Sequence, residues 1–258
     1  SGVFDIRFRK CNNQKREYAV QAGVLGVDLK AEGPFKKGGQ ASYLVNYRLS
    51  SLSIASFIIN YLTVPTYQDL SFKLHLPTEK WGNFSVFGIG GLSDRLKPTE
   101  ESNFVRDLDR FENVLESDMG VLGVRHNYLL KTGSIWETTV AASYANMKDN
   151  KSYLEDTTQF NFLRLRDQNE YTRQPISVAT SFKHRFSPQF LVKTGGQYTH
   201  TFHDYTSVDY DYVENQALTR ADEAGRTNLY QGYAQAQWRP IAPLTYNGGL
   251  KYIFFDQN

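Results

Sequence analysis

Two histidines and an aspartate close together in the chain are the residues whose types best suit a metal ion. Imidazole and carboxylate groups are common metal ligands, and His200, His203 and Asp204 are near neighbours in the sequence. The surrounding pattern predicts a strand, in which residues three apart point to opposite faces of the sheet. His200 and His203 would then not bind the same ion, and we interpret them as a polar strand end that runs into a loop.

Acidic residues in the same region have the oxygen ligands that calcium prefers. Asp209, Asp211 and Glu214 lie close together in the sequence. They lack the glycine and the regular ligand spacing of an EF-hand loop. We therefore interpret this segment as a solvated polar loop and predict no metal site in it.

Other residues with catalytic potential lack the context that catalysis requires. Gly88, Gly90 and Gly91 are loosely similar to a dinucleotide-binding loop, but they lie inside a strand pattern that no helix follows. No nucleophile elbow organises the serine, histidine and aspartate residues. Cys11 has no identifiable activating partner. The sequence thus predicts a protein that is not an enzyme and that has no cofactor.

Aromatic and arginine side chains gather in one polar stretch, at about 148–175. Such side chains suit a sugar or peptide ligand, and long loops often carry binding function. They also suit packing of one loop against another, and the sequence leaves both interpretations open. The residues that we select as ligand candidates are Tyr153, Phe160, Arg164, Arg166 and Tyr171.

Four basic residues alternate with apolar ones in the predicted strands. Their side chains would project from the polar faces, toward the inside of a closed sheet. Each charge that is buried there would need a partner. These interior candidates are Arg48, Lys73, Arg125 and Lys193.

The elements that would position these residues are strands with two unlike faces. Leu70, Phe72 and Leu74 alternate with polar residues, and the same period-two pattern recurs along the whole chain. It predicts about eleven strands: three short ones near 18–22, 25–29 and 43–49, and longer ones at 67–76, 84–92, 118–130, 134–147, 176–186, 189–202, 226–238 and 244–255. Tight turns alternate with long polar loops, which we expect at about 51–66, 93–117, 148–175 and 203–225.

This rhythm indicates an antiparallel transmembrane β-barrel. Strands of about ten residues, with short turns on one side and long loops on the other, are typical of outer-membrane barrels. In 229–239, Tyr230 and Trp238 would face lipid together with the small residues between them, and Gln231 would face a wet interior. Trp81, Trp136 and Trp238 all lie at predicted short turns, where an aromatic belt is expected.

The composition agrees with this interpretation. The chain has 258 residues, a net charge of +2, 14% aromatic residues and a mean hydropathy of −0.50. A barrel faces lipid with only every second residue, so its average hydropathy stays low. The net charge provides no field that would attract nucleic acid. No apolar run is long enough for a transmembrane helix. A soluble β-sandwich also has alternating strands and stays as the alternative fold.

Several segments resemble a known family of membrane proteins. They are SGVFDIRFR at 1–9, QAGVLGVD at 21–28, EGPF at 32–35, SYLVNYR at 42–48, YQDLSFK at 67–73 and FSVFGIGG at 84–91. These segments resemble the end of the plug and the first barrel strands of TonB-dependent outer-membrane receptors. They are most similar to the variety whose precursor carries a carboxypeptidase-like regulatory domain. The resemblance covers residues 1 to about 92, and the remainder matches only in the alternation of strands with short turns and long loops.

The resemblance implies uptake of a nutrient across the outer membrane of a Gram-negative bacterium, with energy supplied by the TonB complex. Residues 1–12 would be the end of a plug domain and its junction, and 13–258 the first half of a barrel of about 22 strands. In such a barrel the interior candidates Arg48, Lys73, Arg125 and Lys193 would line the solute path or contact the plug. Neither a TonB box nor a complete plug is found, and the chain ends without the usual terminal aromatic residue. We therefore expect a partial barrel that another segment or chain must close.

The expected partners are outer-membrane lipid, the TonB complex through a missing N-terminal part, and a surface lipoprotein or larger membrane assembly. No nucleic-acid partner is expected. The nutrient would be a peptide, a glycan or a chelate. The alternative functions are a surface protein that binds a ligand, a structural β-protein, or a barrel subunit of a larger outer-membrane assembly.

Overall fold

A computed structural model of the chain contains one antiparallel sheet. It describes residues 8–23, 26–50, 66–97, 110–154, 163–211, 214 and 216–257. The strands are β1 (Glu17–Ala22), β2 (Val27–Pro34), β3 (Ser42–Leu49), β4 (Thr66–Thr78), β5 (Gly82–Lys97), β6 (Phe111–Leu129), β7 (Ile135–Leu154), β8 (Leu163–Ser187), β9 (Phe190–Asp211), β10 (Gln216–Ile241) and β11 (Leu244–Gln257). In the described part of the chain no helix is long and apolar enough to cross a bilayer.

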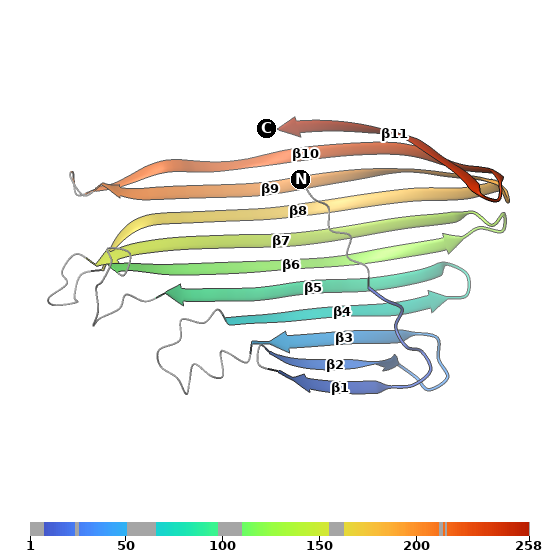
Figure 1. Cartoon of the computed structure of the whole chain (residues 1–258), viewed down its shortest axis with the longest axis horizontal. Coiled ribbons are helices and arrows are strands. Elements are labelled where there is room, and N and C mark those ends of the chain that lie inside the picture. Colours follow the sequence, from blue (N-terminus) through green and yellow to red (C-terminus); the bar gives the residue numbers. More distant parts are fainter. Residues whose placement is uncertain are drawn as a thin grey trace.

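Each strand pairs with the next one in the sequence, from β1 to β11. This meander places successive connections alternately at opposite ends of the sheet (Figure 1). One end, which we call the short-turn end, has the β4–β5, β6–β7, β8–β9 and β10–β11 turns of two to five residues, together with the seven residues between β2 and β3. The other end, which we call the long-connection end, has the sixteen residues between β3 and β4 and the thirteen between β5 and β6, but only four between β9 and β10. The prediction of about eleven strands is confirmed for the described residues. Gly82 and Gly133 have positive φ angles of 78° and 76° at two of the short turns, a conformation that glycine adopts readily.

The register places unlike side chains on the two faces of the sheet. Residues directly opposite each other in neighbouring strands share a face. One face carries Lys73, Phe87 and, through successive pairs, the odd-numbered residues of β4 and β5. The other carries Leu70, Phe72 and Leu74. We call the first the polar face and the second the outer face.

The sheet has no second layer. Among the described residues the only buried hydrophobic side chains are Leu44 and Leu154. The accessible surface is 18201 Å², whereas a globular protein of this mass would expose about 11,600 Å². The alternative of two stacked sheets is therefore wrong for the described strands, because such a sandwich would bury a core between its layers.

The strands extend into regions that the sequence analysis assigned to loops. Parts of the predicted loops 93–117, 148–175 and 203–225 form strand. β5 continues to Lys97, β7 to Leu154 and β9 to Asp211, and the strands that follow them begin at Phe111, Leu163 and Gln216. The prediction was wrong because backbone pairing needs no alternation of apolar and polar residues. Cross-strand polar contacts support these extensions, such as Asn113 Nδ2 to Asp149 Oδ1 at 2.7 Å. Of the fourth predicted loop, 51–66, only Thr66 lies within the described residues.

Residues 8–13 cross the polar face without joining the sheet (Figure 1). Of the segment 1–9, which resembles the end of a plug, only residues 8 and 9 lie within the described residues. The Phe8 ring contacts the Phe87 ring of β5 at a centroid distance of 6.3 Å. The chain then passes the short-turn end of the sheet and enters β1.

Some glycines in the strands make room for a neighbouring aromatic ring, and others do not. A Cβ atom on Gly195 would lie 2.6 Å from the Thr180 carbonyl oxygen and 2.8 Å from the Tyr233 ring. A Cβ on Gly232 would meet no atom within 4 Å. The two positions are close together on β9 and β10, so they make a matched pair.

We expect Gly195→Ala to destabilise the sheet by about 1–3 kcal/mol, because the new methyl group overlaps backbone and ring atoms. Gly232→Ala should leave stability unchanged or raise it by up to about 1 kcal/mol, since alanine restricts the unfolded chain. Urea unfolding of the protein in lipid vesicles or detergent would measure both. Equal effects of the two substitutions would contradict the packing described.

Candidate functional site

The outer face carries a continuous belt of exposed apolar side chains. Twelve of its large apolar residues in β4 to β11 have between 37% and 84% of their surface exposed: Leu70, Leu92, Leu122, Val124, Val140, Tyr144, Ile176, Val178, Tyr198, Tyr230, Leu250 and Tyr252. An exposed apolar surface that crosses this many strands marks an interaction surface. The polar face also exposes a few apolar side chains, such as Met119 and Phe255.

The belt has the same width in strands far apart in the sheet. On β5 it runs from Phe84 to Leu92, and Asp94 follows on the same face. On β10 it runs from Trp238 to Tyr230, and Asn228 follows. Both spans cover eight residue steps, which is about 26 Å along a strand.

Residues that lie opposite each other in successive strands form rows across the sheet. The belt runs obliquely to these rows. The row of Phe84 passes through His126, Thr138, Thr180 and Gly196 to Gly232 on β10. Trp238, where the belt ends on β10, lies six residues beyond Gly232. The row of Leu92 reaches β10 at Ala224, and Tyr230 again lies six residues away. A shift of about 20 Å over five strand spacings of about 4.8 Å corresponds to a slope of about 40°.

Aromatic rings mark the short-turn border of the belt. The predicted cluster of tryptophans is found there: Trp81 lies in the β4–β5 turn, Trp136 near the start of β7 and Trp238 near the end of β10. All three are exposed, by 72%, 52% and 51%. The Trp238 ring stacks on the Tyr246 ring at 5.8 Å. Further contacts join Phe84 to His126 and His184 to Phe186.

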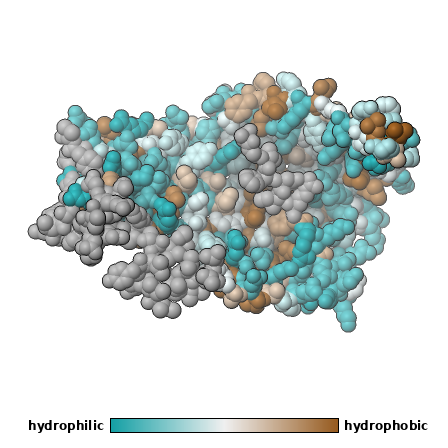
Figure 2. All heavy atoms as spheres, viewed as in Figure 1, coloured by the Kyte–Doolittle hydropathy of each residue, from teal (hydrophilic) through white to brown (hydrophobic). Residues whose placement is uncertain are grey.

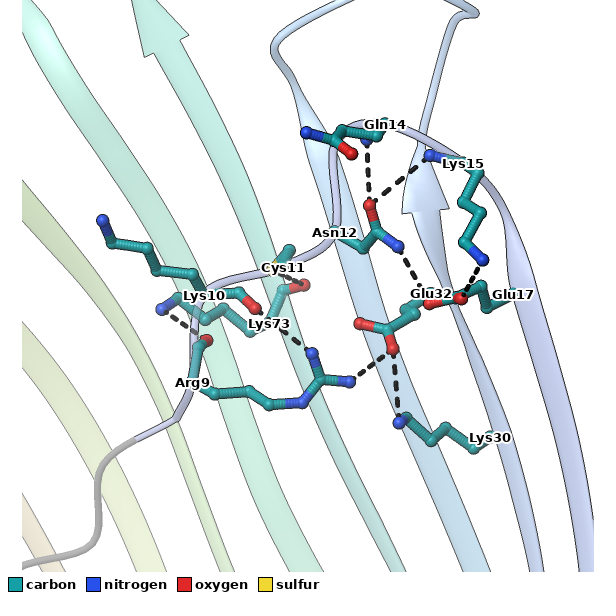
Figure 3. A network of polar contacts seen from close by, with 10 residues as sticks. All are labelled: Arg9, Lys10, Cys11, Asn12, Gln14, Lys15, Glu17, Lys30, Glu32 and Lys73. Carbon is teal, nitrogen blue, oxygen red and sulfur yellow. Dashed lines mark hydrogen bonds and ion pairs between the residues drawn. The ribbon is translucent and has the colours of Figure 1, made fainter.

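The polar face binds the N-terminal segment through charged groups (Figure 3). The Arg9 guanidinium donates to Glu32 Oε1, and Lys30 Nζ lies 3.2 Å from the same oxygen. Glu32 is 3% exposed, and its other carboxylate oxygen has no hydrogen-bond partner among the described residues. Lys73 Nζ donates to the Arg9 carbonyl oxygen at 3.2 Å. These contacts join the segment to β2 and β4.

Cys11 is half-buried in the same contact. Its Sγ–H donates to the Lys73 carbonyl oxygen at 3.6 Å. Burial raises the pKa of the Cys11 thiol, an effect that the nearby Lys73 ammonium group partly opposes. The rate at which the Cys11 thiol is alkylated therefore indicates whether the N-terminal segment stays bound to the sheet.

All four interior candidates lie on the polar face by register, and each has a different neighbour. Arg48 Nη2 pairs with Asp69 Oδ2 at 2.7 Å, and its guanidinium lies 5.3 Å from the centre of the Tyr67 ring. Lys73 holds the N-terminal segment, as described above. Arg125 Nε donates to Thr139 Oγ1 at 3.3 Å. Lys193 Nζ lies 5.8 Å from the centre of the Tyr233 ring. The structure does not bring the four into one cluster.

The ligand candidates of the predicted loop separate into two places. Tyr153 is opposite Arg164 in the β7–β8 pair, and its hydroxyl accepts a 2.6 Å hydrogen bond from Arg110 Nη1. The Arg166 guanidinium lies 5.0 Å from the centre of the Phe111 ring. Phe111 also packs against Tyr153 with a centroid distance of 5.2 Å.

Tyr171 is in a second place, nearer the belt, where its ring contacts that of Tyr205 at 6.4 Å. Its row passes through Met147, six residues and about 20 Å along β7 from Tyr153. Phe160 lies outside the described residues. Seen from the side that the N-terminal segment crosses, hydrophilic residues predominate at the end of the long connections (Figure 2).

Sequence reasoning missed Arg9 and Glu32 as partners, and also Arg110, Phe111 and Tyr205. Glu32 follows Asp28 and Lys30 on the polar side of β2, and this alternation is a signal that could have placed it. The other three lie in stretches that were taken as loops, where alternation was not followed.

His200 and His203 lie on opposite faces of β9, as predicted, because their partners in β10 are Asn228 and Gly225, three residues apart. His200 Nδ1 is 2.7 Å from Asn228 Oδ1. The described residues contain no group of three or more His, Cys, Asp or Glu side chains arranged to hold a metal ion.

Comparison with known proteins adds a fold relationship. No family model matches the chain, and no curated protein sequence matches it. Among solved structures, the copper transporter OprC is similar, with a TM-score of 0.59 and 11% sequence identity over 94% of this chain. The chain has the fold of part of an antiparallel transmembrane β-barrel. It covers 38% of the length of that transporter, and the total number of strands in the barrel stays a prediction.

Removal of the Arg9 side chain should release the N-terminal segment. Arg9→Ala leaves the buried Glu32 carboxylate with Lys30 alone, and a lost charged hydrogen bond is worth about 1–3 kcal/mol. We expect alkylation of Cys11 to become at least about fivefold faster. We also expect its pH profile to move to lower pH, because a raised thiol pKa returns toward its ordinary value when the burial is lost.

Lys10→Ala is the matched control, since Lys10 is exposed in the same segment. It should leave both the rate and the pH profile of Cys11 alkylation unchanged. Fast alkylation of the unaltered protein would contradict the docking of this segment.

Proposed function

We propose that this sheet is the wall of an outer-membrane transporter of a Gram-negative bacterium. The observation that carries the proposal is the oblique apolar belt of constant width. Strands of membrane barrels tilt by about 35–45° from the membrane normal, and a flat bilayer then marks a band that slopes across the hydrogen-bonded rows by the same angle. The slope of about 40° found here matches this tilt.

The thickness of the belt supports the same interpretation. Eight residue steps at this tilt give about 20 Å between the Cα levels of its two borders, and the border side chains extend it toward the roughly 25 Å apolar band of outer-membrane barrels. Aromatic rings at the short-turn border suit the interface between lipid and water. Beyond the opposite border of the belt, charged residues begin on the outer face, for example at Asp94 of β5.

The polar face would line the lumen, with the N-terminal segment as the end of a plug inside it. The contacts of Arg9 with Glu32, and of Lys73 with the Arg9 carbonyl, support this assignment. The resemblance of the first 92 residues to TonB-dependent receptors supports uptake energised by the TonB complex. The finer resemblance, to receptors with a carboxypeptidase-like regulatory domain, stays part of the proposal. So do the division at residue 12 and a surface lipoprotein partner.

The solute that we favour is a peptide or a glycan. The contacts of Tyr153, Phe111 and Arg166 at the outer end of β6 to β8 present aromatic faces and guanidinium groups together. Such surfaces stack on sugars and hydrogen-bond to peptide groups. A metal chelate is the alternative. The name of the copper transporter does not transfer its cargo to this chain, because the likeness to it concerns the fold.

A charge placed in the belt should prevent membrane assembly, and a charge on the other face should not. Ala234 is in the middle of the belt on β10, and Gln235 is its neighbour on the polar face. Arg at the bilayer midplane is unfavourable by about 2–4 kcal/mol on the lipid side of a barrel. We expect Ala234→Arg to lower the yield of heat-modifiable protein in the outer-membrane fraction severalfold, and Gln235→Arg to leave it nearly unchanged. Equal yields of the two variants would contradict the assignment of the faces.

Energised uptake separates a transporter of this kind from a passive pore. Cells that produce the protein should accumulate one of a panel of labelled peptides, glycans and metal chelates. A protonophore should abolish this accumulation, and Tyr153→Ala should weaken binding of that solute severalfold while the protein still assembles. Accumulation that persists without a proton gradient would indicate a porin instead. If no solute is accumulated and the assembled protein conducts none, the transport proposal is wrong.

A further inference from the structure

The outer face is hollowed at one place within the belt. A groove of 610 Å³ lies over β4 to β7, lined almost entirely by apolar atoms. Its floor is the facing pair Gly90 and Gly120, with Gly88 beside them, and Tyr47, Leu122 and Tyr144 are among the side chains around it.

Backbone geometry does not require glycine at the centre of this floor. Gly120 has no positive φ, and a Cβ on it would meet no atom nearer than 3.9 Å. Glycine inside a strand is unfavourable by about 0.5–1 kcal/mol relative to alanine. The hollow at Gly120 therefore exists at the expense of local stability, which is expected where another molecule approaches the backbone closely.

The groove leads toward the long-connection end into a polar hollow of 530 Å³. The two share Tyr47, Gln68 and Leu92, and the acidic residues Asp94, Glu116 and Asp118 line the second. No basic residue lines it in the described part of the chain. Lys148, opposite Glu116 on β7, is held by Glu170 at 3.2 Å. An occupant that fills both hollows needs an apolar tail and a cationic head.

We propose that this groove is a binding site for one acyl chain of an amine-bearing lipid, with the amine in the acidic hollow. The proposal rests on the proposed membrane location, because the groove lies inside the belt that bilayer would cover. The negative charge of the acidic hollow favours a lipid whose headgroup carries an amine. An ammonium group beside three carboxylates is favourable, whereas a headgroup with only a phosphate charge would be repelled.

The test is native mass spectrometry of the complete protein, extracted from its membrane in detergent and stripped of lipid. Phosphatidylethanolamine and phosphatidylglycerol with identical chains are the probes, since they differ in the amine. We expect the unaltered protein to retain the ethanolamine lipid at least fivefold better than the glycerol lipid. Gly120→Leu fills the groove and should lower this retention at least fivefold.

Gly248→Leu is the matched control, because Gly248 is in the outer-face row of β11, away from the groove, and a Cβ there meets no atom within 4 Å. It should retain lipid normally. The double change Glu116→Gln and Asp118→Asn should remove the preference for the amine. Equal retention of lipid by Gly120→Leu and Gly248→Leu would overturn the lipid site. A protein dimer that Gly120→Leu dissociates would also overturn it, because a second copy of the chain would then occupy the groove. Equal retention of the two lipids by the unaltered protein would overturn the amine assignment.

In every sample, the heat-modifiable migration of the protein is measured separately to establish whether the protein assembled in the membrane. If the protein is found in the membrane but retains no lipid, only the groove proposal fails. If it is not in the membrane, the proposed function fails as well.

Discussion

A single layer of β-structure cannot bury its own apolar side chains, and the other features of this molecule follow from that constraint. Strands β2 to β10 each have a hydrogen-bonded neighbour on both sides, and β1 and β11 are the two edges of the sheet. Only two hydrophobic side chains among the described residues are buried. Hydrogen bonding fixes the sheet, and apolar burial must come from something outside it. On the outer face a bilayer fits this requirement, because the apolar belt has the width and slope that a membrane imposes on tilted strands. On the polar face, the N-terminal segment begins to supply the cover.

The two faces meet different physical demands. Against lipid, any apolar side chain is acceptable, and a glycine such as Gly120 can leave a groove in the surface. Against the N-terminal segment, buried charges need partners, and Glu32 accordingly contacts both Arg9 and Lys30. Beyond the belt neither demand applies, and β6 to β10 continue as long polar ladders whose aromatic and arginine contacts are free to serve recognition. In the transporter that we propose, one sheet would thus provide a membrane anchor, a lumen wall and a candidate binding rim.

Much of the fold could be predicted from the sequence, because alternation of apolar and polar residues reports directly on the two faces. The period-two pattern around Leu70 and Tyr230 gave the strand count and the face assignment, and the tryptophans gave the short-turn end. The strand extensions escaped prediction because their apolar residues do not keep to one face. On β6, for example, Val114 and Leu115 are consecutive and therefore point to opposite faces. The pairing of Arg9 with Glu32, and of Arg166 with Phe111, also escaped it, because register between distant strands is a property of the assembled sheet.

Spin labels along β10 test the central claim most directly. Cysteine-linked labels at positions 230 to 238, in the protein reconstituted in lipid bilayers, would be exposed in turn to oxygen, which concentrates in lipid, and to a water-soluble nickel chelate. The account predicts that oxygen accessibility peaks at the even positions and is highest near Ala234, while the odd positions favour the chelate or are shielded by the plug. Uniform chelate access along the strand, or even positions shielded from both reagents by protein, would contradict it.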